Sequence, residues 1–370
     1  MTPLIPAALL EKSEKILFIA HLALGDFTYL QNGFRAFAAA YPHIQIHLWV
    51  DEVRRTSDAS KWEGLRTYSL YDWVEQSGLF ARVYRKTYSP QLYEESLREA
   101  QAEHYPVVVS LAHIRPQLYA DLARMISPEG LVIGTRKPFS PLRPWHYFAY
   151  RKIDAVLASY DGEDAGEHHI SSVYADWFRQ LTGLDIPMAE RYPFVHIPDS
   201  ALEQARAQLA SWGVDTQTTP LVLLNPFAKS HKRAWPLERI TEMIARMQQL
   251  PQWRDACFLV NAMPQELASV NAAIAAAGVP QTRAFSAVDN FFQLPAMLSQ
   301  CSLIISVETS IMHLANAVHV PVIALMRKKN PEWAPFDSAS STVITVARRS
   351  DWVKAISVEQ VLQALPAGKA

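Results

Sequence analysis

Apolar and polar positions follow a repeating order along the chain, in which short apolar runs are separated by longer stretches with helical periodicity. Short strands that alternate with helices form βαβ units around a parallel sheet. The first half therefore predicts a parallel α/β domain. Its apolar or β-branched runs are Ile16–Ala20, Ile44–Val50, Val107–Leu111, Leu131–Gly134 and Val156–Ser159.

The second half repeats this pattern after a break at residues 191–200. Two prolines in the break interrupt both helix and strand, and Ser200 is a suitable N-cap for a helix over Ala201–Trp212. A capping-box sequence at Ser357–Gln360 predicts a last helix over Val358–Leu365. The apolar runs of this half are Leu221–Leu224, Phe258–Val260, Leu303–Val307 and Val322–Leu325.

We therefore expect two doubly wound α/β domains, residues 1–192 and residues 200–350. A helical segment, residues 351–370, follows them, and packing back toward the first domain is one option for it. In open α/β sheets, ligands bind beyond the carboxyl ends of the strands. Candidate chemistry is therefore sought in the loops that follow the predicted strands.

Composition narrows the function classes. With 35 basic and 36 acidic side chains there is no global charge for nucleic-acid binding. The chain has only 12 glycines and neither a G-x-G-x-x-G nor a Walker sequence, which argues against a standard dehydrogenase or P-loop ATPase. Cys257 and Cys301 have no disulfide-framework or zinc spacing. Without an apolar run of about 20 residues or a basic leader, we expect a cytoplasmic protein.

The turn after the run Leu303–Val307 has the features of an anion site. Glu308, Thr309 and Ser310 place a carboxylate and two hydroxyls where a helix begins, and Thr309 or Ser310 can cap that helix. Backbone N–H groups at a helix start favour an anion such as a diphosphate, and His313 faces the same position. The alternative is an ordinary strand-to-helix corner with a capping Thr and a structural His.

A second candidate is the basic loop that begins at Asn225 and ends in Trp235-Pro236. Its cations can stabilise negative charge that develops on a departing diphosphate. A solvated basic loop is the alternative. The cations are Lys229, Lys232 and Arg233.

The third candidate follows the first strand. Gly25 permits a tight turn there, and Asp26 lies at or near the start of the next helix. Asp26 can act as an N-cap, as a general base, or as both. His21 is the rival base because it titrates closer to neutral pH.

These segments resemble glycosyltransferase family 9, the ADP-heptose:lipopolysaccharide heptosyltransferases. The family has Asp-Thr-Gly-x-x-His-Leu-Ala, where this chain has Glu308, Thr309, Ser310 and His313–Ala315. Gly25-Asp26 matches the family's Gly-Asp turn, whose Asp is thought to be the general base.

Other parts of the family pattern match less closely. Arg233 stands where the family has a Lys two residues before Trp-Pro. Glu266 matches the acid of a Gly-x-Pro-x-Glu loop that binds the donor ribose, although a first-turn carboxylate favoured by the helix dipole is equally compatible. After the last predicted strand, Arg327-Lys328-Lys329 replaces Gly-Pro-Thr, which can add phosphate contacts or mark a different donor or acceptor.

The resemblance implies a GT-B fold, in which two Rossmann-like α/β domains face each other across a cleft. The first domain would bind the acceptor and the second the nucleotide sugar. The implied reaction is an inverting, metal-independent transfer of a heptose-like sugar from ADP-heptose to lipopolysaccharide core or a related saccharide, with Asp26 as base and no cofactor. The donor-binding residues would be Asn225, Lys229, Lys232, Arg233, Glu266, Glu308, Thr309, Ser310 and His313.

Two further clusters stay open. Arg136, Lys137 and Arg143 lie among aromatic residues and can meet a phosphorylated acceptor or the anionic headgroups of the cytoplasmic membrane face. A partly buried loop with snorkelling cations explains them equally well. The acidic and histidine residues at 161–169 do not predict a metal site, because adjacent His side chains point apart.

Two other functions fit the same pattern. A nucleotide-sugar epimerase of similar shape would turn over the donor without an acceptor. A degenerate member of the family would bind sugar or nucleotide without transfer, as the departures at Glu308, Ser310 and Arg327 suggest.

Overall fold

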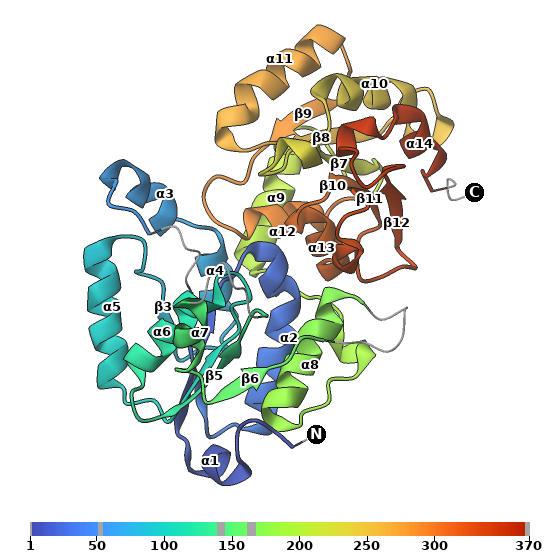
Figure 1. The fold of residues 1–370 in the computed structure, drawn as a ribbon. Coiled ribbons are helices and arrows are strands. Elements are labelled where there is room, and N and C mark those ends of the chain that lie inside the picture. Colours follow the sequence, from blue (N-terminus) through green and yellow to red (C-terminus); the bar gives the residue numbers. More distant parts are fainter. Residues whose placement is uncertain (1, 51–54, 139–144, 161–167, 367–370) are drawn as a thin grey trace. The chain divides into compact units, whose positions relative to one another are not determined.

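The computed structural model describes residues 2–50, 55–138, 145–160 and 168–366. The chain divides into two compact units, Met1–Arg191 and Tyr192–Ala370, each built on a parallel six-stranded sheet (Figure 1).

The first sheet has the order β3-β2-β1-β4-β5-β6, which is the strand order 3-2-1-4-5-6 of a Rossmann fold. The order reverses between β1 and β4, and this is the topological switch point where ligands bind in such sheets. The strands are β1 Lys15–Ala20, β2 Gln45–Val50, β3 Arg82–Tyr84, β4 Val107–Ser110, β5 Leu131–Thr135 and β6 Ala155–Leu157. The helices are α1 Ala7–Lys12, α2 Leu24–Ala40, α3 Trp62–Arg66, α4 Leu70–Gln76, α5 Pro90–Ala102, α6 Pro116–Ile126, α7 Trp145–Tyr150 and α8 Ile170–Thr182.

Aromatic side chains join α2 and α8 to the first sheet. Phe18 of β1 packs edge-on against Phe34 and stacks near Phe178, with ring centroids 5.2 Å and 6.1 Å apart. A Cβ on Gly33 would lie 2.0 Å from Cε2 of Phe178. The two helices can therefore approach this closely only because residue 33 has no side chain.

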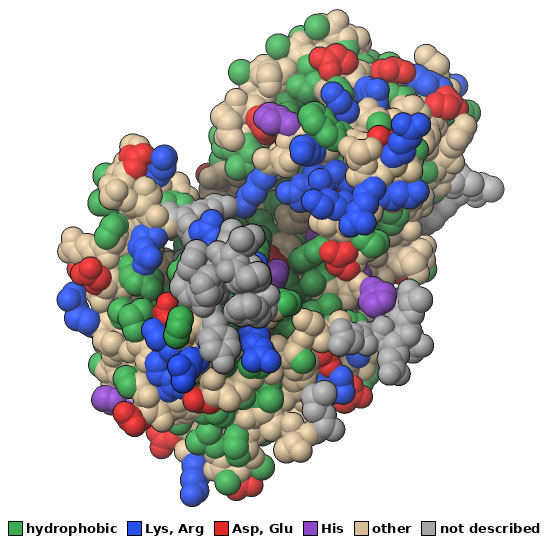
Figure 2. Space-filling view, viewed as in Figure 1, with side chains coloured by type: hydrophobic (Ala, Val, Ile, Leu, Met, Phe, Trp, Pro, Cys, Tyr) green, Lys and Arg blue, Asp and Glu red, His purple; other side chains and the backbone are tan. Residues whose placement is uncertain are grey.

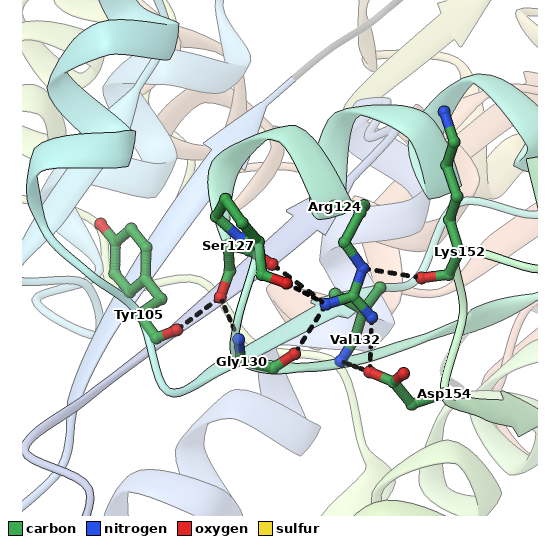
Figure 3. A network of polar contacts seen from close by, with 8 residues as sticks. Tyr105, Arg124, Ser127, Gly130, Val132, Lys152 and Asp154 are labelled. Carbon is green, nitrogen blue, oxygen red and sulfur yellow. Dashed lines mark hydrogen bonds and ion pairs between the residues drawn. The ribbon is translucent and has the colours of Figure 1, made fainter.

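The other face of the sheet is covered by α5 and α6, and Arg124 of α6 ties two loops to it (Figure 3). Its guanidinium donates to the carbonyls of Ser127 and Gly130 and to the carboxylate of Asp154. That carboxylate also accepts the backbone N–H of Val132 at 2.8 Å. One partly buried cation therefore fixes the starts of β5 and β6.

The second sheet has the order β12-β11-β10-β7-β8-β9. Counted from β7, this is again 3-2-1-4-5-6, and the switch point lies between β7 and β10. The strands are β7 Leu221–Asn225, β8 Cys257–Asn261, β9 Thr282–Phe285, β10 Leu303–Val307, β11 Val322–Met326 and β12 Ser341–Thr345. The helices are α9 Asp199–Ser211, α10 Leu237–Met247, α11 Leu267–Ala277, α12 Gln293–Leu298, α13 Ser310–Ala317 and α14 Val358–Gln363.

The C-terminal helix α14 belongs to the core of the second unit. It packs against α10, and its residues Val358 and Val361 are buried with the apolar face of that helix. The predicted capping box is confirmed, because Ser357 Oγ accepts the backbone N–H of Gln360 and Gln360 Oε1 accepts that of Ser357.

Both cysteines are buried and unpaired in the second unit. Burial raises the pKa of the Cys257 thiol, and complete burial raises that of Cys301 more strongly. Both side chains are therefore neutral thiols packed among apolar residues.

The residues on either side of the unit boundary are anchored separately. Arg191 donates from Nε to the carbonyl of Ile186 at 2.7 Å. Tyr192 donates to Asp337 Oδ2 at 2.9 Å and stacks on the His319 ring. Each side of the junction is therefore fixed within its own unit.

All strands predicted from apolar runs are present, and three further strands were not predicted. These are β3, β9 and β12, which lie at the sheet edges and show mixed exposure, whereas central strands such as β7 and β10 are buried throughout. An edge strand covered on fewer sides needs no continuous apolar run, so its sequence signal is weak.

Two local predictions were wrong. Helix α9 begins at Asp199 after Pro198, so Ser200 lies inside the first turn and does not cap it. The fixed φ of Pro198 is already suited to a helix start. Gly25 lies in the first turn of α2, so it does not form the predicted tight turn before the helix.

Candidate functional site

Asn225 is at the centre of a buried polar network at the switch point of the second sheet. Its Nδ2 donates to Ser306 Oγ at 3.1 Å and to Thr309 Oγ1 at 3.0 Å. Its Oδ1 accepts from Asn261 Nδ2 at 3.0 Å. The carboxyl ends of β7, β8 and β10 are thereby held together. Asn225, predicted to bind the donor, uses its amide inside the protein.

Helix α13 starts at this edge. Thr309 is its N-cap, with Oγ1 accepting the backbone N–H of Ile311 at 3.4 Å, as predicted for Thr309 or Ser310. The first N–H groups of a helix have no intrahelical acceptor. His313, one turn further on, is only 3% exposed, and its ring centroid lies 5.8 Å from that of Trp333. His313 is therefore held in a fixed position by packing, one turn after the N-cap of α13.

Glu308 is a buried carboxylate between two arginines. Its side chain is 4% exposed, and its oxygens accept from the Arg327 backbone N, Nε and Nη2, each at 3.3 Å. Arg233 Nη1 lies 3.9 Å from Glu308 Oε1. A buried charge is tolerated when it is paired in this way. Residues that follow β7, β10 and β11 therefore meet at one carboxylate.

The remaining predicted cations of the basic loop lie at the surface. Lys229 and Lys232 are exposed. Lys232 Nζ is 5.9 Å from the ring centroid of Trp352, and Lys354 Nζ is 4.8 Å from the same centroid. Lys and Arg side chains gather on the face of the second unit seen in Figure 2. Trp235 of the predicted Trp-Pro corner is buried, and its Nε1 donates to the Ile356 carbonyl. Trp235 therefore anchors the basic loop to the segment that precedes α14.

Glu266 lies at the end of the short helical turn Pro264–Glu266, directly before α11. Its Oε2 accepts the backbone N–H of Met263 at 2.9 Å. This is the geometry of a first-turn carboxylate. Its binding of a donor ribose stays a prediction.

Asp26 occupies the corresponding switch point of the first sheet. It lies in the first turn of α2, and its Oδ2 accepts the backbone N–H of Ala23 at 2.9 Å. Its Oδ1 accepts from the Tyr174 hydroxyl at 2.8 Å. Burial raises the pKa of Tyr174 well above its ordinary value, and the Asp26 charge adds to the shift. The phenol is therefore a fixed donor to the carboxylate.

His113 follows β4 on the other side of the same switch point. Its ring centroid is 6.4 Å from that of Trp177, a neighbour of Tyr174 in α8. Partial burial of the ring lowers the pKa of His113 and the negative charge of Asp26 opposes this shift, although the residue as a whole is exposed. The imidazole therefore lies in the electrostatic surroundings of the Asp26–Tyr174 pair and contacts the neighbouring Trp177 ring.

Comparison with known proteins identifies the family. Residues 152–360, more than half of the chain, match the sequence model of glycosyltransferase family 9 (heptosyltransferase). The chain belongs to glycosyltransferase family 9. Comparison with curated protein sequences gives no match.

Solved family 9 structures share the fold. A glycosyltransferase family 9 protein from Veillonella parvula superposes with a TM-score of 0.72 at 17% identity, covering 95% of each chain. The E. coli ADP-heptose lipopolysaccharide heptosyltransferase II gives 0.66 at 16% identity, covering 94% of this chain and 96% of that one. E. coli heptosyltransferase WaaC, solved with ADP-2-deoxy-2-fluoro heptose, gives 0.63 at 14%, covering 95% and 98%. The predicted GT-B fold is confirmed.

The weaker predictions for the first unit fall partly outside the described residues. Arg136 and Lys137 are exposed directly after β5, and the Lys137 backbone N–H lies 3.4 Å from the Tyr150 hydroxyl. Arg143 and residues 161–167 lie outside the described part of the chain. His169 caps α8 by accepting the backbone N–H of Ser171.

Two features are absent from the described residues. Among residues 2–50, 55–138, 145–160 and 168–366, no group of three or more His, Cys, Asp or Glu side chains is arranged to hold a metal ion. In the same residues, no helix combines the length and apolar character that crossing a membrane requires.

Several residues of these two candidate clusters were not predicted from the sequence. Tyr174 reaches Asp26 from 148 positions away, and no local pattern marks it. His113 has a usable signal, since it comes soon after the buried run of β4, where sheet ligands bind. Ser306 was read as part of an apolar strand, yet it bonds to Asn225.

Proposed function

We propose that this family 9 protein is an inverting, metal-independent glycosyltransferase. It moves a heptose-like sugar from a nucleotide diphosphate donor, ADP-heptose by resemblance, to a lipopolysaccharide core or related saccharide. The observation that carries the proposal is the Asp26 carboxylate, held at the first switch point by Tyr174 and the backbone of Ala23 in a chain of this family.

Asp26 is suited to accept the acceptor's proton. A carboxylate has about four lone-pair positions, and the two hydrogen bonds described for Asp26 occupy one on each oxygen. The acceptor hydroxyl oxygen forms a bond to the anomeric carbon while its proton passes to Asp26. The bond from that carbon to the diphosphate oxygen breaks on the opposite face, which inverts the configuration.

The second unit would hold the donor and stabilise the leaving group. The bond pair of the broken C–O bond stays on the diphosphate, so negative charge grows there during the reaction. Positive charge comes from Arg233 and Lys232, which follow β7. Backbone N–H donors come from the start of α13 at Thr309 and Ser310. Both sets of groups lie beyond the carboxyl ends of the strands. These groups stabilise the negative charge of the leaving diphosphate, as a divalent cation does in other transferases.

The first unit would bind the acceptor. Arg136 and Lys137 are exposed directly after β5. Such cations suit a phosphorylated saccharide or an anionic lipid headgroup. We propose that Arg136, Lys137 and Arg143 meet the acceptor at the cytoplasmic face of the membrane.

The test begins with calorimetry of the wild-type protein against a panel of nucleotide sugars, followed by a transfer assay with the donor that binds. Replacement of Asp26 by Ala should leave donor binding intact and abolish most transfer. Transfer at a nearly native rate by Asp26→Ala would reject the base assignment. Donor turnover without acceptor would instead indicate an epimerase.

A second candidate is a family 9 member that binds a nucleotide sugar without transferring it. The pairing of Glu308 with two arginines favours it, since both oxygens of this carboxylate already accept from Arg327. Donor affinity in the wild-type protein without transfer to any saccharide acceptor would select this function.

A further inference from the structure

The environment of Glu308 assigns it a role different from sugar recognition. We infer that Arg327 binds the donor diphosphate together with Arg233, and that Glu308 is a positioning residue that sets both guanidinium groups. The inference rests on the proposed function and extends it to the part of the donor that these residues recognise.

Arg327 is fixed at both ends by one carboxylate. Glu308 Oε2 accepts its backbone N–H and its Nε–H, and Oε1 accepts from Nη2, each at 3.3 Å. A side-on pair of this kind fixes the plane of the guanidinium as well as its position. Holding the backbone at the same time sets where the side chain leaves β11. The direction of Arg327 is therefore determined before any ligand arrives.

The fixed guanidinium keeps donors for a ligand. The hydrogen bonds formed by Arg327 within the described residues use Nε and Nη2, so Nη1 remains for another acceptor. Its side chain is 15% exposed and that of Arg233 is 31% exposed, while Glu308 is 4% exposed. The negative charge is thus covered and both positive groups reach solvent.

The sum of charges also points to an anion. Two guanidinium groups share one carboxylate, so this cluster carries one excess positive charge. Planar guanidinium groups suit the paired oxygens of phosphate. A carboxylate placed only to bind sugar hydroxyls would need its oxygens turned outward.

The position of the cluster matches that of the helix start. Glu308 directly precedes Thr309, the N-cap of α13, and Val307 pairs with Leu325 of β11, two residues before Arg327. Arg233 comes from the loop after β7, the other neighbour of β10. The arginines therefore approach the first turn of α13 from the two strands that flank β10.

Calorimetry with ADP, UDP and GDP tests this assignment, because these nucleotides carry a diphosphate and no transferred sugar. We expect Glu308→Gln and Arg327→Gln each to weaken the affinity for the most tightly bound of these nucleotides about tenfold or more. The double variant should bind no more than about threefold weaker than Arg327→Gln, since Glu308 acts mainly through that residue and contributes less through Arg233, whose Nη1 lies 3.9 Å away. A sugar-binding Glu308 would leave nucleoside diphosphate affinity within twofold of wild type and would overturn the inference.

Other outcomes separate this inference from the proposed function. A wild-type protein that binds none of the three nucleotides, nor any nucleotide sugar, would reject both. Tighter binding by Glu308→Gln would show that the carboxylate merely repels the ligand, and would also overturn the positioning role.

Controls address charge and folding. Arg254→Gln removes an exposed arginine that precedes β8, at the end of the strands opposite to the Glu308 cluster. This variant should leave the affinity for nucleotide unchanged. If Arg327→Gln does not fold, Arg327→Lys keeps the charge without the bidentate fork and should still weaken binding several-fold. Glu308→Asp keeps the charge but shortens the reach, so it should weaken binding in the same direction.

Discussion

The two units have the same strand order and place a carboxylate at the same topological point, yet they surround it differently. Asp26 in the first unit receives a neutral phenol and a backbone N–H. Glu308 in the second receives two guanidinium groups. Glu308 is therefore surrounded by positive charge, whereas the two groups that donate to Asp26 are neutral. Equal topology is therefore compatible with our proposal that one carboxylate accepts a proton while the other holds cations.

The largest test of this contrast is Asp26→Asn. The amide keeps the shape of the side chain but cannot take a proton, so we expect kcat to fall about 10²–10⁴-fold. The affinity for nucleoside diphosphate should stay within twofold of wild type. Steady-state transfer kinetics and calorimetry measure the two quantities. A loss of affinity without loss of kcat would place Asp26 in binding and remove the contrast.

The next largest effect concerns the packing of α2, the helix that contains Asp26, against α8. Gly33→Ala would place a methyl group 2.0 Å from Cε2 of Phe178, where α2 meets α8. Overpacking of this kind costs about 1–3 kcal/mol of unfolding free energy, measurable in urea. A Cβ on Gly64 would meet nothing within 4 Å, so Gly64→Ala is the matched control and should be neutral or slightly stabilising. Equal stability of both variants would show that α2 and α8 are not tightly joined.

A smaller effect is expected from Tyr174→Phe, which deletes the hydroxyl that holds Asp26. Loss of one hydrogen bond to a charged group corresponds to about 1.5 kcal/mol, or roughly tenfold in kcat. The same change in an Asp26→Asn background should have little further effect, because the phenol acts through the carboxylate. An independent tenfold loss in that background would assign Tyr174 a separate role.

The smallest effect concerns pH. His47 is 4% exposed, and burial lowers its pKa in the folded protein, so between the folded value and the unfolded value of about 6.5 the unfolded state binds more protons. Stability should therefore fall as pH drops from above 6.5 through the folded pKa, despite the opposing charge of Glu103. In His47→Gln the free energy of unfolding, measured in urea, should change less between pH 8 and 5. The exposed His113 is present in both proteins. Parallel curves would contradict the expectation.

The sequence predicts those parts of the molecule whose signal is local. Central strands such as Leu303–Val307 are buried on both faces and require continuous apolar runs, and caps such as Thr309 and Ser357 act over a few residues. Edge strands such as β12 are partly exposed and carry no such run.

Side-chain partners were harder to predict because they come from distant segments. Asp26 was identified as a candidate, but its partner Tyr174 was not. Glu308 and Arg327 were both singled out, yet their pairing depends on β10 and β11 lying next to each other. Residue type and spacing can name such groups, while the fold decides which of them meet.

The buried cysteines have a practical consequence. Cys257 and Cys301 are neutral, solvent-excluded thiols, and thiolate is the form that reacts with maleimides and similar reagents. A cysteine introduced at an exposed helix position should therefore be labelled selectively without removal of a native residue. A dye attached in this way to the second unit can then follow nucleotide binding there by its fluorescence.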